Sequence, residues 1–304
     1  MSTPFAPTIA GSTLPLPPRP TTDSTRDIPS DVLRGDLRRF RASGFRHMDL
    51  VDTWISPADL TPRQLRTLAD ELADHDITLA GLSVIRRSIV DPVHGADNYA
   101  YTRRSIEAAA ALGAPILSIG FHRPLTAAQR DWGAFWSVPG PTDGEREYTR
   151  AVPALTELCA LAADFGIELS LELYEDTLVG TGARTMRLIE ATGAANLGVN
   201  ADLANLHRAP RPLEETWSQT LDLVLDRMNY WHVKNYRRVE NYPHGPYLAW
   251  PTPLADGDID YRAALHRARA AGYAGPLCVE HYGGDALTAQ TAGLRYLTDL
   301  LETM

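Results

Sequence analysis

The chain has 304 residues and a mass of 33.4 kDa, and its 44% hydrophobic and 22% charged residues exclude wholesale disorder. A formal net charge of −9 argues against a protein whose main task is to hold nucleic-acid phosphates. No apolar run is long enough to cross a bilayer, residues 1–20 lack a secretory pattern, and the two cysteines fit a reducing compartment, so we expect a cytoplasmic protein.

Short β-like apolar runs alternate along the chain with longer segments of helical period, which indicates βα units and a parallel sheet. The predicted strands cover residues 8–14, 45–51, 77–84, 115–120, 167–173, 197–201, 230–233 and 276–281. The predicted helices cover residues 29–42, 62–74, 98–112, 145–165, 182–191, 213–225, 261–271 and 288–301. Thr61 followed by Pro62 is typical of a helix start, and Gly166 of a helix end.

Eight βα units are the number that closes a parallel sheet into a barrel. The alternative, a doubly wound open sheet, lacks the glycine-rich turn expected after its first strand. We therefore predict a single (β/α)8 domain over residues 1–304, in which residues 1–28 form an N-terminal strand and a Pro-rich link. Catalytic groups of such a barrel lie at the C-terminal ends of the strands and in the loops that follow.

Two of these loops are long, residues 122–144 after the fourth strand and residues 236–256 after the seventh. Both are rich in aromatic residues, including Trp136 and Trp250. We expect a packed lid that also forms one wall of a pocket for a sugar ring or a planar aglycone. Asp49 and Asp52, near the end of the second strand, and Trp54 are candidates for the opposite wall.

The last four predicted strands each end in a side chain that can bind a metal ion: Glu172, Asp202, His232 and Glu280. One such residue alone is explained by a salt bridge at the rim, but four on one face of a barrel need a shared counter-charge. A divalent cation supplies it. Three carboxylates and one imidazole suit Mn²⁺ or Mg²⁺ first, with Co²⁺ or Zn²⁺ as alternatives. Cys278 is interpreted as a core residue and not a ligand.

These endings, together with residues 257–261 and 272–280, resemble the sugar phosphate isomerase/epimerase superfamily, the xylose-isomerase-like TIM barrel group. The resemblance covers roughly residues 28–302. It implies that Glu172, Asp202, His232 and Glu280 bind the metal. It also implies that Glu172 and Glu280 are the paired acid and base on opposite faces of the substrate. In ketose epimerases of this group the third residue after the Asp is His, whereas here it is Asn205.

Other polar residues near the strand ends are candidates for catalysis or substrate binding. His122, just after the fourth strand, is either an acid/base group or a loop hydrogen bonder. Lys234, the only lysine of the chain, either binds a substrate oxygen or forms a salt bridge with Glu172 or Asp202. The remaining candidates for substrate binding are Asn205, His207, Arg238, Trp54, Trp136 and Trp250.

The leading hypothesis is a metal-dependent isomerase or epimerase that forms an enediolate from a sugar or keto-sugar. The alternative is a lyase with the same first step, such as a C-glycoside deglycosidase catalytic subunit acting on 3-oxo-glycosides, or an inosose- or dehydroshikimate-type dehydratase. The aromatic loops, His122 and Asn205 favour this alternative. We expect a small sugar or glycoside substrate, no nucleic-acid or membrane partner, and a homo-oligomer or a smaller β-rich partner subunit.

Overall fold

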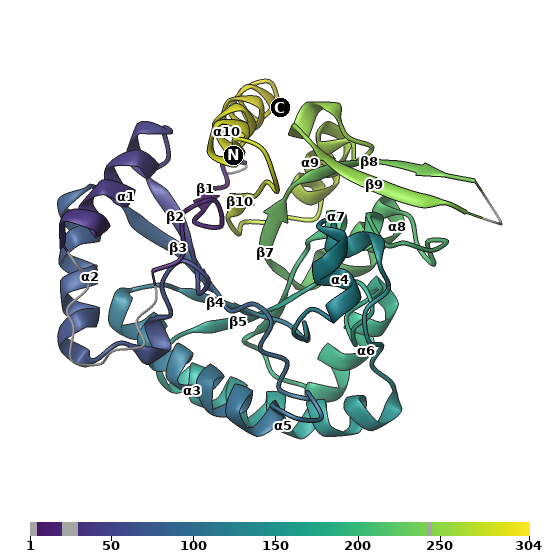
Figure 1. Ribbon diagram of the computed structural model, residues 1–304, viewed down its shortest axis with the longest axis horizontal. Coiled ribbons are helices and arrows are strands. Elements are labelled where there is room, and N and C mark those ends of the chain that lie inside the picture. Colours follow the sequence, from purple (N-terminus) through teal and green to yellow (C-terminus); the bar gives the residue numbers. More distant parts are fainter. Residues whose placement is uncertain (1–4, 20–29, 242–244) are drawn as a thin grey trace.

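Eight parallel strands close into a barrel, which confirms the predicted (β/α)8 fold (Figure 1). The computed structural model describes residues 5–19, 30–241 and 245–304, so much of the predicted N-terminal link lies outside the described residues. The strand order around the barrel is β1-β10-β7-β6-β5-β4-β3-β2. The barrel strands are β1 (Ile9–Ser12), β2 (His47–Val51), β3 (Thr78–Ser83), β4 (Ile116–Ile119), β5 (Glu168–Glu172), β6 (Leu197–Asn200), β7 (Met228–Val233) and β10 (Leu277–Val279).

The helices surround the barrel (Figure 1). They are α1 (Ser30–Ala42), α2 (Pro62–Asp74), α3 (Gly95–Leu112), α5 (Glu145–Asp164), α6 (Gly182–Thr192), α8 (Trp217–Val224), α9 (Tyr261–Ala270) and α10 (Ala286–Glu302). The Thr61 side chain accepts from the Gln64 amide and the Gln64 side chain accepts from Thr61, a reciprocal cap at the start of α2. None of the helices in the described ranges is both long and apolar enough to span a membrane.

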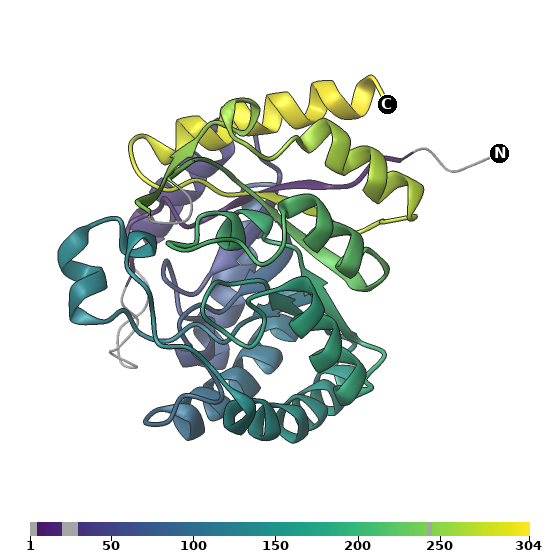
Figure 2. The same ribbon diagram turned by 90° about the vertical axis from the view of Figure 1, so that its right-hand side faces the viewer.

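The two long segments after β4 and β7 contain secondary structure of their own. The first holds the short helix α4 (Ala127–Trp132) and the turn η2 (Phe135–Ser137). The second forms an antiparallel hairpin of β8 (Asn235–Glu240) and β9 (Tyr247–Thr252), which projects from the barrel in Figure 1. In Figure 2 the start of β1 and the C-terminus lie at one end of the barrel, and the α4 segment lies at the other end.

One short helix, α7 (Leu203–His207), follows β6 and has no counterpart among the predicted elements, because five residues are too few to show a helical period. The predicted helix over residues 213–225 begins only at Trp217. Thr216 and Gln219 form a reciprocal cap there, so the chain before this point runs as a loop.

The barrel interior changes from apolar to polar along its axis. The layer further from the C-terminal ends of the strands is a small buried cluster of Ala10, Ala80, Ile116, Tyr230 and Cys278. Because side chains alternate along a strand, the residues two positions further on also face inward, and several of them are polar. Asn200 Nδ2 donates to Ser118 Oγ over 2.9 Å, and Ser83 Oγ donates to Asp49 Oδ1 over 2.9 Å. The interior therefore leads directly to the ionisable residues at the strand ends.

Candidate active site

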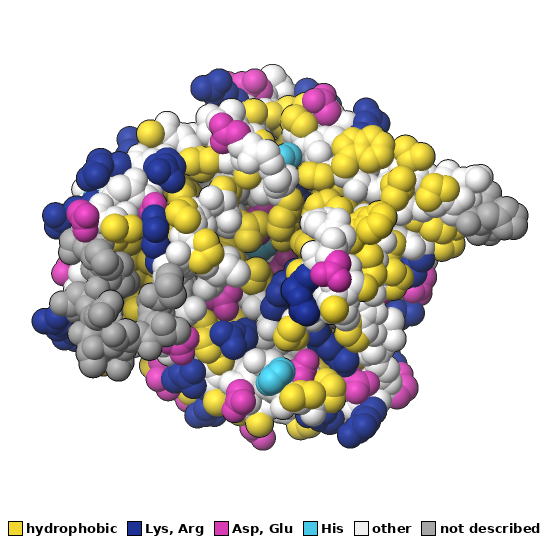
Figure 3. Space-filling view, in the orientation of Figure 1, with side chains coloured by type: hydrophobic (Ala, Val, Ile, Leu, Met, Phe, Trp, Pro, Cys, Tyr) yellow, Lys and Arg dark blue, Asp and Glu magenta, His cyan; other side chains and the backbone are white. Residues whose placement is uncertain are grey.

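The predicted metal-binding residues lie together at the C-terminal end of the barrel. Glu172 ends β5 and His232 lies in β7, whereas Asp202 is the N-cap of α7 and Glu280 directly follows β10. Ligand atoms of Glu172, Asp202 and His232 all lie within 4.8 Å of one another. Glu280 Oε1 lies 3.3 Å from His232 Nδ1, so the fourth residue adjoins the same cluster. All four side chains are buried. Figure 3 shows a hollow on this face with acidic and histidine side chains at its floor.

The geometry around His232 assigns different roles to its two nitrogens. Nδ1 lies 3.3 Å from Glu280 Oε1 and 3.7 Å from Glu172 Oε1, and it is a buried atom without a hydrogen bond among the described residues. Nε2 lies 3.5 Å from Asp49 Oδ2. Burial alone would lower the pKa of His232, but the carboxylates around it, Glu280 first, raise that pKa well above its usual value. Asp49 thus faces the nitrogen that points away from the cluster.

Lys234 neutralises two of the carboxylates. Its Nζ lies 2.5 Å from Asp202 Oδ2 and 2.7 Å from Glu280 Oε2, so the predicted salt bridge with Asp202 exists and the one with Glu172 does not. Burial would lower the pKa of Lys234, but Asp202 and Glu280 raise it well above its usual value. Burial likewise opposes the ionisation of Glu280, and Lys234 and His232 hold its pKa below the usual range. The lysine is a cation fixed beside the cluster.

Asn205 supports the Glu172 carboxylate. Its Nδ2 donates to Glu172 Oε1 and to the Leu173 carbonyl, both over 3.0 Å, while its backbone amide donates to Asp202 Oδ1 over 3.1 Å. Because α7 begins at Asp202, the first turn of this helix carries Asn205 back towards the end of β5. Asn205 therefore positions two carboxylates.

His122 lies on the other side of Glu172. The backbone amide of Arg86 lies 3.4 Å from His122 Nδ1 and can only donate to it, which leaves the ring proton on Nε2. His122 Nε2 lies 3.6 Å from Glu172 Oε2 and makes no hydrogen bond among the described residues. Burial lowers the pKa of His122 to about 4, so the ring is neutral near pH 7. A Cβ on Gly120 would lie 2.7 Å from His122 Nε2, so this ring position requires glycine there.

A narrow cavity opens in front of these residues. Its lining is Leu14, Val51, Ile85, Arg86, His122, Glu172, Tyr174, Glu280 and Tyr282. The walls beside the carboxylates are therefore mainly apolar or aromatic. His122 packs on Tyr174 with a ring separation of 4.1 Å, and Lys234 Nζ lies 5.1 Å from the centre of the Tyr282 ring.

Arg208 anchors the aromatic side chains around this cavity. It is 1% exposed, donates to both oxygens of Glu175 at 2.9 and 3.2 Å, and donates to Tyr236 Oη over 3.1 Å. Its guanidinium carbon lies within 5.0 to 5.7 Å of the rings of Phe135, Trp136, Tyr174, Tyr236 and Tyr282. These rings come from the segments after β4, β5, β7 and β10, so a single buried arginine joins four loops.

The predicted lid segments contact each other. Trp136 is 9% exposed and its Nε1 donates to the Ala249 carbonyl of the hairpin over 2.8 Å. Its ring also packs against Tyr282, with the two ring centres 6.0 Å apart. The segments after β4 and β7 therefore meet beside the cavity, although residues 242–244 of the second lie outside the described residues.

None of the seven predicted substrate-binding residues lines this cavity itself. Lys234 and Asn205 contact its carboxylates and Trp136 packs against Tyr282, whereas the other four lie further away.

Trp54 is 1% exposed and donates to Asp36 Oδ2, as a core residue. Trp250 is 47% exposed and pairs with Arg237 across the hairpin, on the face opposite to buried Ala249. The hairpin pairing thus turns this side chain outward. The other two residues hold loops in place.

His207 Nε2 lies 3.1 Å from Asp258 Oδ2, and burial lowers the pKa of this histidine. Arg238 donates to the carbonyls of His207, Ala209 and Arg211, which follow or end α7. Both side chains therefore fasten the α7 region to the hairpin and the loop before α9. Their long polar side chains reach backbone and carboxylate partners instead of the cavity.

Three cavity residues escaped the sequence predictions. Tyr174 and Tyr282 each stand two positions after one of the paired glutamates, Glu172 and Glu280. The alternation along an extended chain gives a signal for both tyrosines. Arg86 has no such signal, because the direction of its side chain depends on a left-handed backbone, with φ of 56°.

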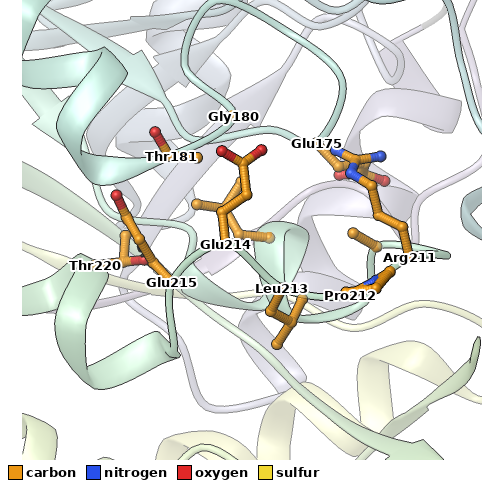
Figure 4. A pocket seen from close by; sticks show the side chains of 11 residues that line it. Glu175, Gly180, Thr181, Arg211, Pro212, Leu213, Glu214, Glu215 and Thr220 are labelled. Carbon is orange, nitrogen blue, oxygen red and sulfur yellow. Dashed lines mark hydrogen bonds between the residues drawn. The ribbon is translucent and has the colours of Figure 1, made fainter. Parts of the chain in front are cut away.

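A separate hollow lies beside α6 and α8 (Figure 4) and has a structural explanation. The Glu215 carboxylate accepts from the backbone amides of Gly182 and Ala183 at 2.7 and 3.1 Å, and from Thr220 Oγ1 at 2.9 Å. An acidic side chain at these amides stabilises the N-terminus of α6. Glu215 is thus engaged in capping the helix.

The donor set at the strand ends fits a divalent cation. It offers three carboxylates and His232 Nδ1, a buried nitrogen without a hydrogen-bond partner in the described part of the chain that faces two of those carboxylates. Oxygen-rich sets of this kind suit hard cations such as Mg²⁺ and Mn²⁺.

Cys278 lies near Asp49 and His232, but burial raises the pKa of its thiol well above the usual value. Cys278 is fully buried in the core.

Comparisons with known proteins identify the family of this barrel. The family model described as "Xylose isomerase-like TIM barrel" matches residues 37–300. No curated protein matches the chain by sequence. Among solved structures, a xylose isomerase-like TIM barrel protein from Mycobacterium smegmatis, in complex with magnesium, is 34% identical. It has a TM-score of 0.90, and the match covers 100% of this chain and 99% of that chain.

More distant structures share the fold. A D-allulose 3-epimerase from Methylomonas sp. is 16% identical with a TM-score of 0.69, covering 99% of this chain and 100% of that chain. A 3-keto-D-glucoside 4-epimerase from E. coli is 14% identical with a TM-score of 0.66, covering 97% of this chain and 100% of that chain.

Proposed function

Because the chain belongs to the xylose isomerase-like TIM barrel family, we propose that it is a divalent-metal-dependent isomerase or epimerase of a sugar or keto-sugar. One observation carries the proposal. Glu172 and Glu280 are both buried at the mouth of the barrel and both border the same cavity. Two carboxylates in one cavity suit a reaction in which one group removes a proton and the other returns it.

The residues that would hold the metal are Glu172, Asp202, His232 and Glu280. A bound divalent cation would supply positive charge that stabilises the negative charge developing on a substrate oxygen. Mn²⁺ is our first choice because the set has three carboxylates and no thiolate. The 34% identical protein was obtained in complex with magnesium, which supports a hard cation for this chain.

The side chains around the cluster would prepare the carboxylates for proton transfer. Lys234 and Asn205 each hold one carboxylate oxygen, Glu280 Oε2 and Glu172 Oε1 respectively. Within the described part of the chain, this leaves the other oxygen of each glutamate free of a short hydrogen bond to a side chain. We assign proton exchange with the substrate carbon to Glu172 Oε2 and to the Glu280 carboxylate, whose Oε1 also faces His232 Nδ1. Because the site is buried, its charges interact more strongly than in water.

The lyase with the same first step is the second candidate, and two observations favour it. Tyr174 and Tyr282 give the cavity flat aromatic walls, which suit a planar leaving group. His122 presents Nε2–H beside Glu172 without another hydrogen-bond partner in the described ranges, so it holds a proton that a leaving oxygen or carbon could accept. This reaction would release the protonated aglycone and leave an unsaturated keto-sugar.

Solvent exchange tests the shared first step. The protein, first stripped with EDTA, is incubated in D₂O with Mn²⁺ or Mg²⁺ and a panel of ketoses, keto-sugar acids and 3-oxo-glycosides. Proton NMR then follows deuterium entering the carbon beside the carbonyl. We expect metal-dependent exchange with at least one substrate. An isomer as product supports the epimerase, whereas a free aglycone supports the lyase.

Matched variants connect the exchange to the two glutamates. Glu172→Gln and Glu280→Gln are each expected to abolish exchange, while Glu190→Gln, at an exposed position of α6, leaves it unchanged. The proposal fails if no member of the panel exchanges with any metal, or if exchange persists in both variants of the cavity glutamates.

A further inference from the structure

The basic residues around the cavity are nearly all paired with carboxylates. Arg208 is paired with Glu175, Arg123 with Asp143, Arg211 with Asp176, and Lys234 with Asp202 and Glu280. Such pairing is expected, because an uncompensated charge in a partly buried site is costly. Each of these cations therefore has a structural partner within the protein.

Arg86 is the exception. Among the described residues, its guanidinium donates only to the Arg123 carbonyl at 3.3 Å and to Tyr174 Oη at 3.5 Å, and both hydrogen bonds are long. In the part of the chain that the structure describes, no carboxylate lies within ion-pair distance of it. The nearby Glu175 is already held by both nitrogens of the Arg208 fork. Most of the five N–H donors of Arg86 are thus available to a ligand.

The backbone of Arg86 is also unusual. Its φ of 56° lies in the left-handed region, which a residue with a Cβ rarely adopts. Three neighbouring contacts hold it there. The Arg86 amide donates to His122 Nδ1, the Ile85 amide donates to Asp52 Oδ1 at 3.1 Å, and the Ser88 amide donates to the His122 carbonyl at 3.1 Å. Strained residues that are held in this way concentrate at functional sites.

This conformation places the guanidinium at the catalytic cavity. Arg86 lines the cavity together with His122, Glu172 and Glu280, and also lines the adjoining hollow beside Arg123. Its guanidinium carbon lies 4.8 Å from the Phe135 ring, which also packs against Arg208. An aromatic neighbour leaves the N–H edge of a guanidinium free for a planar or tetrahedral anion.

We propose that Arg86 determines substrate specificity by binding an anionic group, a carboxylate or a phosphate, of the sugar on which the enzyme acts. The inference rests on the proposed function, since it concerns the substrate of that same site. It deepens that function from sugars in general to acidic sugar derivatives. In this arrangement the reacting carbon lies at the two glutamates while the anionic group lies at the guanidinium.

Equilibrium binding to the Mg²⁺-loaded protein tests the proposal. Calorimetry compares three probes at fixed free Mg²⁺ and ionic strength: 5-keto-D-gluconate, D-fructose 6-phosphate and neutral D-fructose. We expect at least one charged probe to bind about 10–100-fold more tightly than D-fructose, the scale of a charge-assisted hydrogen bond. Tighter binding of 5-keto-D-gluconate identifies a carboxylate as the preferred group, and tighter binding of D-fructose 6-phosphate identifies a phosphate.

Three variants separate ligand binding from packing. Arg86→Gln should lose the preference for the charged probe and keep the Mg²⁺ affinity and melting temperature. Arg86→Lys should retain part of the preference, because it keeps the charge but not the fork. Arg87→Gln is the matched control, because Arg87 is exposed, packs over Tyr101 and is absent from the cavity lining; it should behave as the wild type.

The outcomes distinguish this inference from the proposed function. The inference is overturned if the wild type binds neither charged probe more tightly than D-fructose. It is also overturned if Arg86→Gln weakens charged and neutral probes equally, which would make Arg86 a packing residue of the lid. Metal-dependent exchange without a charge preference refutes only the inference. A charge preference that depends on Arg86, with no exchange on any substrate, refutes the epimerase and lyase assignments alone.

Discussion

The buried pair of Arg208 and Glu175 gives a stability prediction that the structure can quantify. The Arg208 side chain is 0% exposed and that of Glu175 is 5% exposed, so water cannot replace a lost partner. Glu175→Gln would keep the side-chain size, but it would remove the negative charge and turn an NH₂ group towards the guanidinium. One of the two hydrogen bonds from Arg208 would be lost, and a buried cation would remain without its counter-charge.

We expect this change to lower the free energy of unfolding by about 3–5 kcal/mol, the usual cost of breaking a buried ion pair by removing one partner. Adding Arg208→Met to Glu175→Gln should restore part of the loss, because it removes the unpaired charge. Activity should fall in the double variant nevertheless, because the aromatic rings around the cavity lose the arginine that joins them.

Urea unfolding followed by circular dichroism measures both variants. Glu214→Gln is the matched control, because Glu214 accepts from Arg184 Nη2 with both oxygens while the two side chains are 51% and 54% exposed. An exposed pair contributes about 0–1 kcal/mol. Equal losses in Glu175→Gln and Glu214→Gln, or a double variant less stable than Glu175→Gln alone, would refute the reasoning from burial.

Three further predictions concern the cavity and its supports. Gly120→Ala, whose Cβ would lie 2.7 Å from His122 Nε2, should displace that ring and lower exchange about 10–100-fold, with Mg²⁺ affinity unchanged by calorimetry. Asp49→Asn should weaken Mg²⁺ binding about 10–100-fold, because Asp49 orients the His232 imidazole; an unchanged affinity would contradict this. Burial raises the pKa of Asp52 to about 7, so the folded protein retains a proton there that the unfolded chain loses above about pH 4. Stability should therefore fall by about 1–3 kcal/mol between about pH 5 and pH 7 relative to Asp52→Asn, as measured by urea unfolding at both pH values.

The strand ends were predictable from the sequence because their chemistry is visible there. An ionisable residue that follows an apolar strand is predicted to lie near the other such residues, because the C-terminal ends of parallel strands meet at the same end of the barrel. Glu172, His232 and Glu280 meet in this way. Lys234 belongs to the same pattern, two residues after His232, and one of its two predicted alternatives, the ion pair with Asp202, is present.

The residues of the long segments were less predictable because tertiary pairing decides their directions. Trp250 carries the same aromatic signal as Trp136, yet the register of the hairpin turns it outward while Trp136 packs inward. Trp54 follows a strand end but donates to Asp36 of α1, so a partner distant in sequence determines its place. Arg86 depends on a backbone conformation that composition does not encode.

The layered interior of the barrel explains why the ionisable cluster is surrounded by side chains that form ion pairs and hydrogen bonds with its carboxylates. Beneath His232 lies an apolar layer that includes Ile116 and Cys278, so the cluster is not solvated from below. In such surroundings an ion pair gains strength and an unpaired group becomes costly. Lys234 and Asn205 fix individual carboxylate oxygens accordingly. Two groups that face the cavity, the guanidinium of Arg86 and Nε2–H of His122, lack strong partners among the described residues, and the proposed substrate would contact both.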